Sequence, residues 1–168
     1  MANTITEHRL VDTNKRTLAK YILVSDGTQY ANSVLLDVST LKFALNANGY
    51  IMASNTHPKS TYKTNIRRIT GQLASANGKV FVQWHGDSNS TIVVTGSGRF
   101  DFDFWSMGDG AVFTNPEANS SGDLLITTAG LAAGDAATIL IDVRKDNYDY
   151  DAGQTADPYA FNRGTPNA

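Results

Sequence analysis

The residues of this chain that could carry out acid–base or metal chemistry are few and lie far apart. Its three histidines, His8, His57 and His85, show no spacing of two or four residues, which is the spacing that places two imidazoles on one face of a strand or helix. They would form a metal site only by converging in three dimensions. We interpret them as exposed loop or edge residues, and we expect no bound metal and no cofactor.

Two carboxylates suggest a different chemistry. Asp101 and Asp103 follow Arg99 in the run RFDFDF, and on a strand they would share one face, roughly 7 Å apart. Paired carboxylates serve as acid and nucleophile in glycoside hydrolysis. Alternating charges are also ordinary on the solvent face of an amphipathic strand, and we favour this interpretation. We therefore expect no catalytic residue and no enzymatic activity.

Other carboxylates and glycines lack the patterns of ion and phosphate sites. Asp146, Asp149, Asp151 and Asp157 make the start of the last stretch acidic, and calcium prefers several carboxylate oxygens. The glycine of an EF-hand loop is missing, so we interpret this stretch as solvated. Gly96-Ser97-Gly98 separates two expected strands instead of opening a helix, which argues against a phosphate cradle.

Aromatic and basic side chains are the remaining candidates for binding. Trp84 is in phase with Val80 and Val82, which predicts a core position, whereas Trp105 could stack on a sugar. A small basic cluster consists of Lys59, Lys63, Arg67 and Arg68. It could meet an acidic partner, although a solvated charge group is the more ordinary interpretation.

Composition narrows the possible partners. The chain has 168 residues, a net charge of −2 and 18% charged residues, so no overall field favours nucleic acid or an anionic membrane. It has no cysteine, which excludes disulfides and thiolate zinc sites. No apolar run has the length of a membrane span, and MANTITEHRL lacks the apolar segment of a signal peptide. We expect one domain, made in a cytoplasm.

Strand patterns dominate the chain. Phe100, Phe102 and Phe104 alternate with charged residues, which predicts a half-buried strand with Phe102 in the core. Asn77-Gly78 separates two β-rich runs, so we expect a hairpin with a type I′ turn and a positive φ at Gly78.

Further turn sequences predict the same arrangement elsewhere. Asp26-Gly27 suggests a second hairpin, and residues 123–130 and 137–145 suggest another strand pair. About eight short strands separated by turns indicate an all-β fold. We predict an antiparallel, jelly-roll-like β-sandwich over residues 1–145.

The final stretch, residues 146–168, changes character. It is polar and has no periodicity, so we expect an extended C-terminal arm. The candidate partner-binding residues are the rings and one cation spaced along it: Tyr148, Tyr150, Tyr159, Phe161 and Arg163. Rings are common interface anchors, so we expect an arm that is mobile alone and ordered in an assembly. The alternative is an arm that folds back and seals a sheet edge of its own domain.

The order of the strands resembles a family of small virion proteins of tailed phages. The similarity lies in MANTITEHRLVDTNKRTLAKYILVSDGT, VLLDVSTL, IRRITGQLASANGKVFVQWHGDSNSTIVVTGSGRFDF, SGDLLITTAG and ATILIDVRK, and it covers most of residues 1–145. The motifs are structural, and members of the family are generally structural components, so no catalytic residue is carried over.

The resemblance implies a virion structural protein, made in the host cytoplasm and then added to the particle. We expect a capsid decoration or cement protein that binds the major capsid protein or other virion proteins and forms a homo-oligomer. Neither nucleic acid nor a membrane is expected as a partner. One alternative is a neck or tail component. The other is a carbohydrate-binding module that uses exposed aromatic residues.

Overall fold

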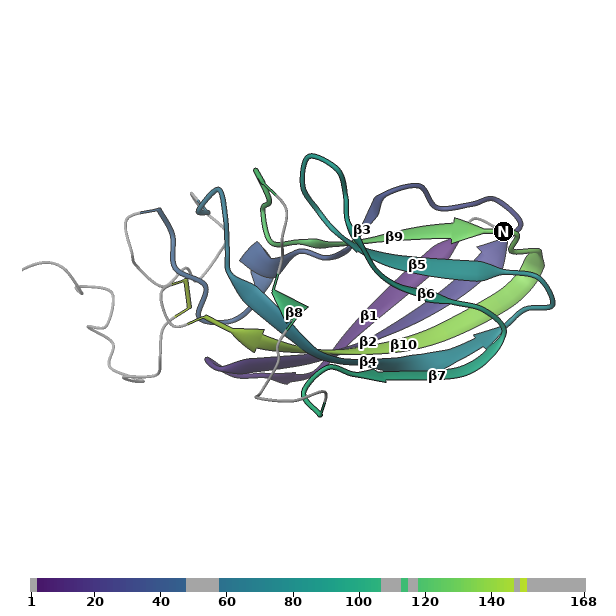
Figure 1. Ribbon diagram of the computed structural model, residues 1–168, viewed down its shortest axis with the longest axis horizontal. Helices are drawn as coiled ribbons and strands as arrows, with labels where there is room; N and C mark the ends of the chain where they lie inside the picture. Colours follow the sequence, from purple (N-terminus) through teal and green to yellow (C-terminus); the bar gives the residue numbers. More distant parts are fainter. Residues whose placement is uncertain (1–2, 48–57, 107–112, 115–117, 147–148, 151–168) are drawn as a thin grey trace, which may run out of the picture.

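A computed structural model describes residues 3–47, 58–106, 113–114, 118–146 and 149–150. Two antiparallel sheets pack face to face, so the predicted all-β sandwich is confirmed (Figure 1). The one helical segment among these residues is a single 3₁₀ turn, η1 (Val38–Thr40). In the part of the chain described here, no helix has the length and apolar character needed to cross a membrane.

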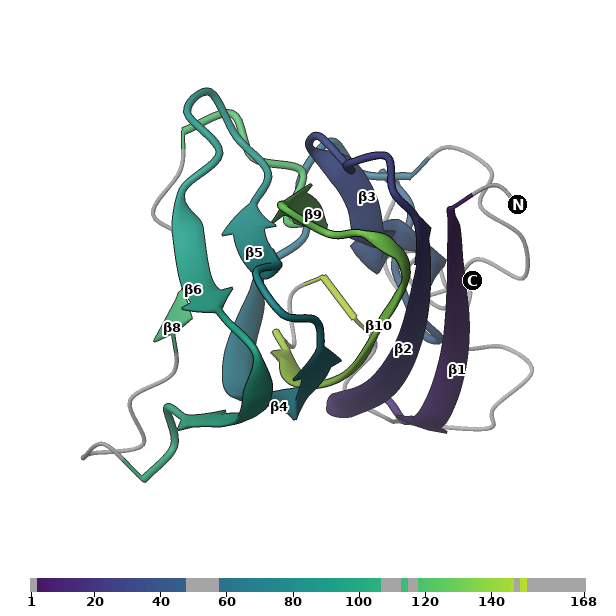
Figure 2. The ribbon, with the colours of Figure 1, turned by 90° about the vertical axis from the view of Figure 1, so that its right-hand side faces the viewer.

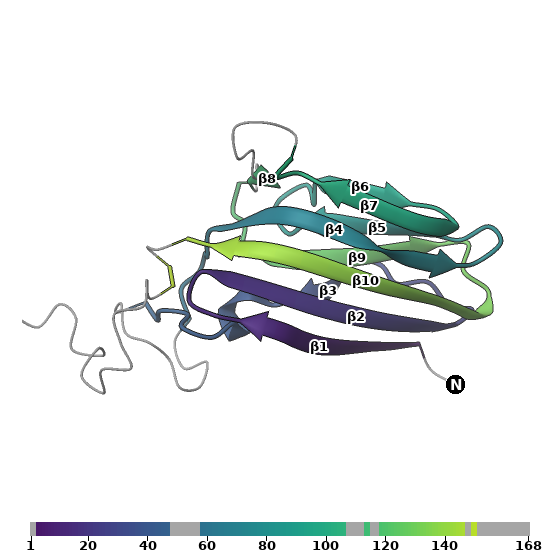
Figure 3. The same ribbon diagram turned by 90° about the horizontal axis from the view of Figure 1, so that it is seen from below.

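The larger sheet has six strands. Its order is β1-β2-β10-β4-β7, and β8 pairs with the N-terminal end of β4. The bounds are β1 (Thr4–Asp12), β2 (Arg16–Asp26), β10 (Ala133–Lys145), β4 (Thr64–Ala74), β7 (Gly98–Asp103) and β8 (Phe113–Thr114). The longest strand, β10, therefore lies at the centre, between β2 and β4 (Figure 3).

The smaller sheet has four strands in the order β3-β9-β5-β6. The bounds are β3 (Ser33–Leu36), β9 (Leu124–Ala129), β5 (Lys79–Trp84) and β6 (Thr91–Thr95). Without β1 and β8, the two sheets read 2-10-4-7 and 3-9-5-6. This is the strand order of an eight-stranded jelly roll, in which the chain alternates between two sheets.

Four of the connections that carry the chain from one sheet to the other are turns at the right-hand end in Figure 1. They join β2 to β3, β4 to β5, β6 to β7, and β9 to β10. The hairpins predicted at Asp26-Gly27 and Asn77-Gly78 are therefore wrong, as is the pairing of residues 123–130 with 137–145. Only the β1–β2 and β5–β6 connections join neighbours within a sheet. Turn residues reverse the chain in either case, and they do not determine which sheet the next strand joins.

Gly78 needs a second correction, because it does not have a positive φ. Its N–H donates a hydrogen bond to Ser75 Oγ at 2.8 Å, and a Cβ at this position would collide with Leu131 and Ser75. Glycine is required here for close approach and not for a left-handed turn. The left-handed glycines of the crossing turns are Gly27 (φ 98°), Gly98 (φ 102°) and Gly130 (φ 69°).

The core lies between the sheets. It includes Trp84 at 0% exposure, and Val80 and Val82 on the same face of β5, as predicted. Phe100 and Phe102 also face inward, beside Gly71 and Ile69 of β4, but they are only half-buried. The predicted face is confirmed, and Phe102 packs against the core as a partly buried side chain. Phe102 is only half-buried because β7 is an edge strand of its sheet.

Candidate partner-binding site

The C-terminal residues after β10 begin with a tight turn against the domain. Tyr150 N–H donates to the Asp146 carbonyl at 3.0 Å, and Leu45 N–H donates to the Asp149 carbonyl at 2.9 Å. A β-bridge joins Ala44 to Tyr150. These backbone hydrogen bonds attach residues 149–150, which follow β10, to residues 44–45, which follow η1.

Tyr150 fills a slot at this end of the sandwich. Its side chain is 0% exposed, and its hydroxyl donates to the Val38 carbonyl at 2.8 Å. Its ring packs on Tyr62 with a centroid distance of 5.5 Å, and the Tyr62 hydroxyl donates to the Leu45 carbonyl. Burial raises the pKa of Tyr150 well above its usual value, so the phenol stays neutral.

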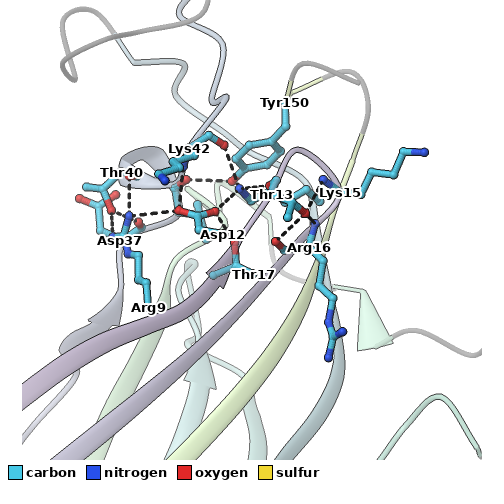
Figure 4. Close-up of polar contacts among 12 residues, drawn as sticks. Arg9, Asp12, Thr13, Lys15, Arg16, Thr17, Asp37, Thr40, Lys42 and Tyr150 are labelled. Carbon is cyan, nitrogen blue, oxygen red and sulfur yellow. Dashed lines mark hydrogen bonds and ion pairs between the residues drawn. The ribbon is translucent and has the colours of Figure 1, made fainter. Parts of the chain in front are cut away.

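Near this ring lies the buried ammonium of Lys145, the last residue of β10, whose partners Asp12, Thr13 and Lys42 are labelled in Figure 4. Lys145 Nζ donates to Asp12 Oδ1 at 2.5 Å, to the Thr13 carbonyl at 2.7 Å and to the Lys42 carbonyl at 2.8 Å. All three donors of the ammonium are therefore used. Nζ also lies 5.1 Å from the centroid of the Tyr150 ring.

Asp12 is satisfied as well. Its Oδ1 accepts a bond from the Thr17 hydroxyl at 2.9 Å, and its Oδ2 accepts one from Lys42 N–H at 3.0 Å. Burial lowers the pKa of Lys145, and the hydrogen bond to Asp12 opposes that effect. The pair is thus a closed structural network, with no proton donor left for a substrate.

Asp149 joins the C-terminal turn to the basic cluster. Its Oδ1 accepts from Lys59 Nζ at 2.9 Å, and its Oδ2 accepts from Lys63 N–H at 2.7 Å. Lys59 and Lys63, two of the four residues of that cluster, therefore bind Asp149 of the same chain. No group of three or more possible metal ligands occurs among the described residues.

These contacts correct the prediction for Tyr150, which lies inside the domain and not in an exposed arm. Residues 149–150 fold back on their own domain, but their bridge to Ala44 lies outside the named strands, so they do not seal a sheet edge as the alternative arm would. Tyr148, Tyr159, Phe161 and Arg163 lie outside the described residues. Sequence reasoning missed Lys145 and Asp12, because a lysine after an alternating strand looks like an ordinary solvated end.

The two carboxylates considered for glycoside hydrolysis have separate partners. Asp101 receives two hydrogen bonds from the guanidinium of Arg68, one of them from Nε at 2.8 Å, and both side chains are about half exposed. The hydrogen bond from Arg68 lowers the pKa of Asp101, which disfavours a role as general acid. Asp103 instead accepts from the N–H groups of Trp105 and Ser106, at 3.1 and 3.2 Å.

One cluster of possible catalytic residues was not predicted. Ser121 Oγ lies 3.1 Å from His85 Nδ1 and donates to Asp123 Oδ2 at 2.6 Å. In a nucleophilic triad the imidazole lies between the hydroxyl and the carboxylate. Here the serine is in the middle, so the carboxylate does not orient the imidazole. The two partners of this contact are 36 residues apart, and no local pattern could have indicated it.

Trp105 is the exposed aromatic residue that the sequence singled out. Its ring is 44% exposed, and the guanidinium of Arg67 lies 4.2 Å from the ring centroid. Arg67 is the extra residue of a β-bulge, because Asp142 pairs with Arg68 and Val143 with Ile66. One face of the indole is therefore occupied by a cation.

Apolar side chains are also exposed on the outer faces of both sheets. Val34 and Val94 are 56% and 47% exposed on the four-stranded sheet, and Val24 is 43% exposed on the six-stranded sheet. A shallow depression of about 410 Å³ lies on the six-stranded sheet. Its lining consists of Ile22, Gly71, Gln72, Ala74, Arg99, Ala136, Ala137 and Thr138.

Comparison of the chain with protein-family models gives no match, and comparison with curated proteins gives none either.

Proposed function

We propose that this protein is a structural component of a tailed-phage particle, acting as a decoration or cement protein on the outside of the capsid. It binds the major capsid protein or other virion proteins as a homo-oligomer, without nucleic acid, membrane or cofactor. The strand-by-strand resemblance to small tailed-phage virion proteins supports this location. Many weak contacts on a repeating shell add up to strong binding.

The observation that carries the proposal is the anchored root of the C-terminal segment. Tyr150 and Lys145 attach the end of β10 to the sandwich, so the chain is held at a fixed point where residues 151–168 begin. If fully extended, that segment reaches at most about 60 Å, which is enough to contact a neighbouring subunit. Tyr159, Phe161 and Arg163 are the residue types that anchor protein interfaces.

The polar contacts of the domain support a binding role over a catalytic one. Asp12, Asp101 and Asp149 each accept hydrogen bonds from a cationic side chain of the same chain. Apolar side chains remain exposed on both sheet faces. Such a surface is suited to docking on protein.

The test is a reconstruction of the particle, with and without residues 151–168 of this protein. We expect copies across the capsid lattice for the full chain and a large loss of occupancy for the truncated one. Phe161→Ala should reduce occupancy, whereas Val94→Ala serves as a control on the four-stranded sheet. Density confined to the neck or tail would favour that alternative, and full occupancy of the truncated chain would contradict the arm.

A second candidate function is favoured by one observation, the exposed indole of Trp105 held by Arg67. Its free face could stack on a sugar ring, as in carbohydrate-binding modules. A glycan array probed with the full chain and with Trp105→Ala tests this function. Binding that is lost in the variant would support it.

A further inference from the structure

The first strand of the larger sheet lies outside the body of the sandwich. In Figure 2, β1 extends the sheet past β2, beyond the strands that face it. No residue of β1 before Asp12 is buried, and Thr4 and residues 6–10 are exposed, whereas β2 buries every second residue from Thr17 to Ser25. This strand adds little to the core, so its length needs another explanation.

The outer edge of β1 has no backbone partner in the described part of the chain. Its ladder runs to β2 alone, from Thr4 to Asp12. An open edge of this length presents a row of N–H and C=O groups that can pair with another strand. Exposed Leu10, at 53%, lies on the same strand.

The charges on β1 match those of a second copy of itself. Glu7 and Arg9 lie on the same face, opposite Tyr21 and Ala19 of β2, and Arg9 Nε donates to Glu7 Oε1 at 2.6 Å. If two copies of β1 pair antiparallel around a two-fold axis, side chains on one face must meet the same face of the partner strand. Such pairing centres on one residue, which then lies opposite itself.

Three central registers are available, and the charges distinguish them. Centring on Glu7 places two carboxylates face to face, and centring on Arg9 places two guanidiniums face to face. Centring on His8 places Glu7 opposite the partner's Arg9 and Arg9 opposite the partner's Glu7. Opposite charges across a strand pair are favourable and like charges are unfavourable, so only this register is complementary.

We propose that β1 is a self-association edge, through which two copies form an antiparallel pair centred on His8. The two larger sheets then join into one continuous sheet across the two-fold axis. The regular ladder covers Glu7–Arg9 of each copy, because Leu10 is the extra residue of the bulge and interrupts the strand at that point. This inference does not depend on a role in the virion.

The test uses charge reversals in the full chain, measured by sedimentation equilibrium over a concentration series. We expect the natural sequence to dimerise, and Glu7→Arg or Arg9→Glu alone to weaken the dimer by roughly tenfold or more. Mixing the two variants should restore dimers in a 1:1 ratio, because each new like-charge pair becomes an opposite-charge pair. Arg99→Glu, an exposed reversal on β7, should leave dimerisation unchanged.

A second measurement does not depend on those variants folding. Because the chain has no cysteine, His8→Cys can carry a single spin label. Residues opposite each other on paired strands have Cβ atoms about 5 Å apart, so two labels should couple strongly. A label at Val34→Cys on the other sheet should show no such coupling. A monomer at all concentrations, or a mixture that fails to associate, would overturn the proposal.

Discussion

At the scale of residues, the C-terminal end of β10 is held by one buried ion pair and one buried ring. The Lys145 ammonium and the Asp12 carboxylate are almost fully buried, with side-chain exposures of 0% and 5%. Burying two charges is costly unless every donor and acceptor is satisfied. Backbone carbonyls of two other segments complete the set, which explains why these charges are tolerated inside the domain.

Tyr150 should be worth much more to stability than a residue of a loose arm. Tyr150→Ala should lower the free energy of unfolding by about 3–5 kcal/mol, because it empties a filled slot. Tyr150→Phe should lower it by about 1–2 kcal/mol, because the Val38 carbonyl loses its hydrogen bond. Urea denaturation measures both. Tyr30→Phe is the control, and a fully stable Tyr150→Ala would show that the slot is not formed.

The buried phenols also predict how stability changes with pH. Burial raises the pKa values of Tyr21, Tyr62 and Tyr150 above 10.0. Above about pH 10 the unfolded chain loses these protons and the folded chain retains them, so stability falls as the pH rises. Tyrosinate absorbance and circular dichroism should then change together for the buried group. Ionisation of all seven tyrosines near pH 10 with the fold intact would contradict this.

At the scale of elements, the strands were more predictable than their connections. Alternation in β5 and β7 identified the inner faces, because burial repeats every second residue whatever the partner strand. The four crossing turns were not predictable, since the residues of a hairpin also suit a turn between sheets. The contacts of the C-terminal site could not be predicted from the sequence for a related reason. Lys145 is buried only because Thr13 and Lys42, remote in sequence, supply carbonyls.

Gly71 of β4 illustrates a packing requirement within a strand. A Cβ at this position would collide with the Thr138 carbonyl of β10 and lie 2.8 Å from the Phe100 ring. Gly71→Ala should therefore destabilise by roughly 2–4 kcal/mol, because backbone on one side and a ring on the other leave no room. A Cβ at Gly96 meets nothing within 4 Å, so Gly96→Ala should be nearly neutral.

Thermal unfolding of the two glycine variants provides the comparison. The expected result is a clearly lower melting temperature for Gly71→Ala alone. Equal melting temperatures would mean that β4 and β10 can separate at this point without cost, which their continuous ladder argues against.

At the scale of the whole molecule, the two ends of the sandwich have different roles. One end carries the four crossing turns, and the other carries the network of Lys145, Asp12 and Tyr150 (Figures 1 and 4). The domain therefore extends past the boundary at residue 145 that sequence reasoning placed there, and the last described contact is at Tyr150.

Two truncations test where the folded domain ends and the C-terminal arm begins. Ending the chain after Tyr150 should leave the urea midpoint close to that of the full protein, because every contact described here is kept. Ending it after Lys145 should destabilise by about 3–5 kcal/mol, because the Tyr150 slot is emptied. Equal stability of the two shortened chains would show that residues 146–150 contribute nothing to the fold.

The central position of β10 also affects how the chain is made. It comes last in the chain among the described strands, yet it pairs with both β2 and β4. Until β10 emerges, the edges of β2 and β4 that it will pair with have no partner. Unpaired strand edges promote aggregation. The six-stranded sheet closes only after β10 has been made, and contacts so distant in sequence form slowly, over milliseconds to seconds. A nascent copy thus exposes these two edges until β10 is available, and slower or cooler expression should raise the yield of folded protein.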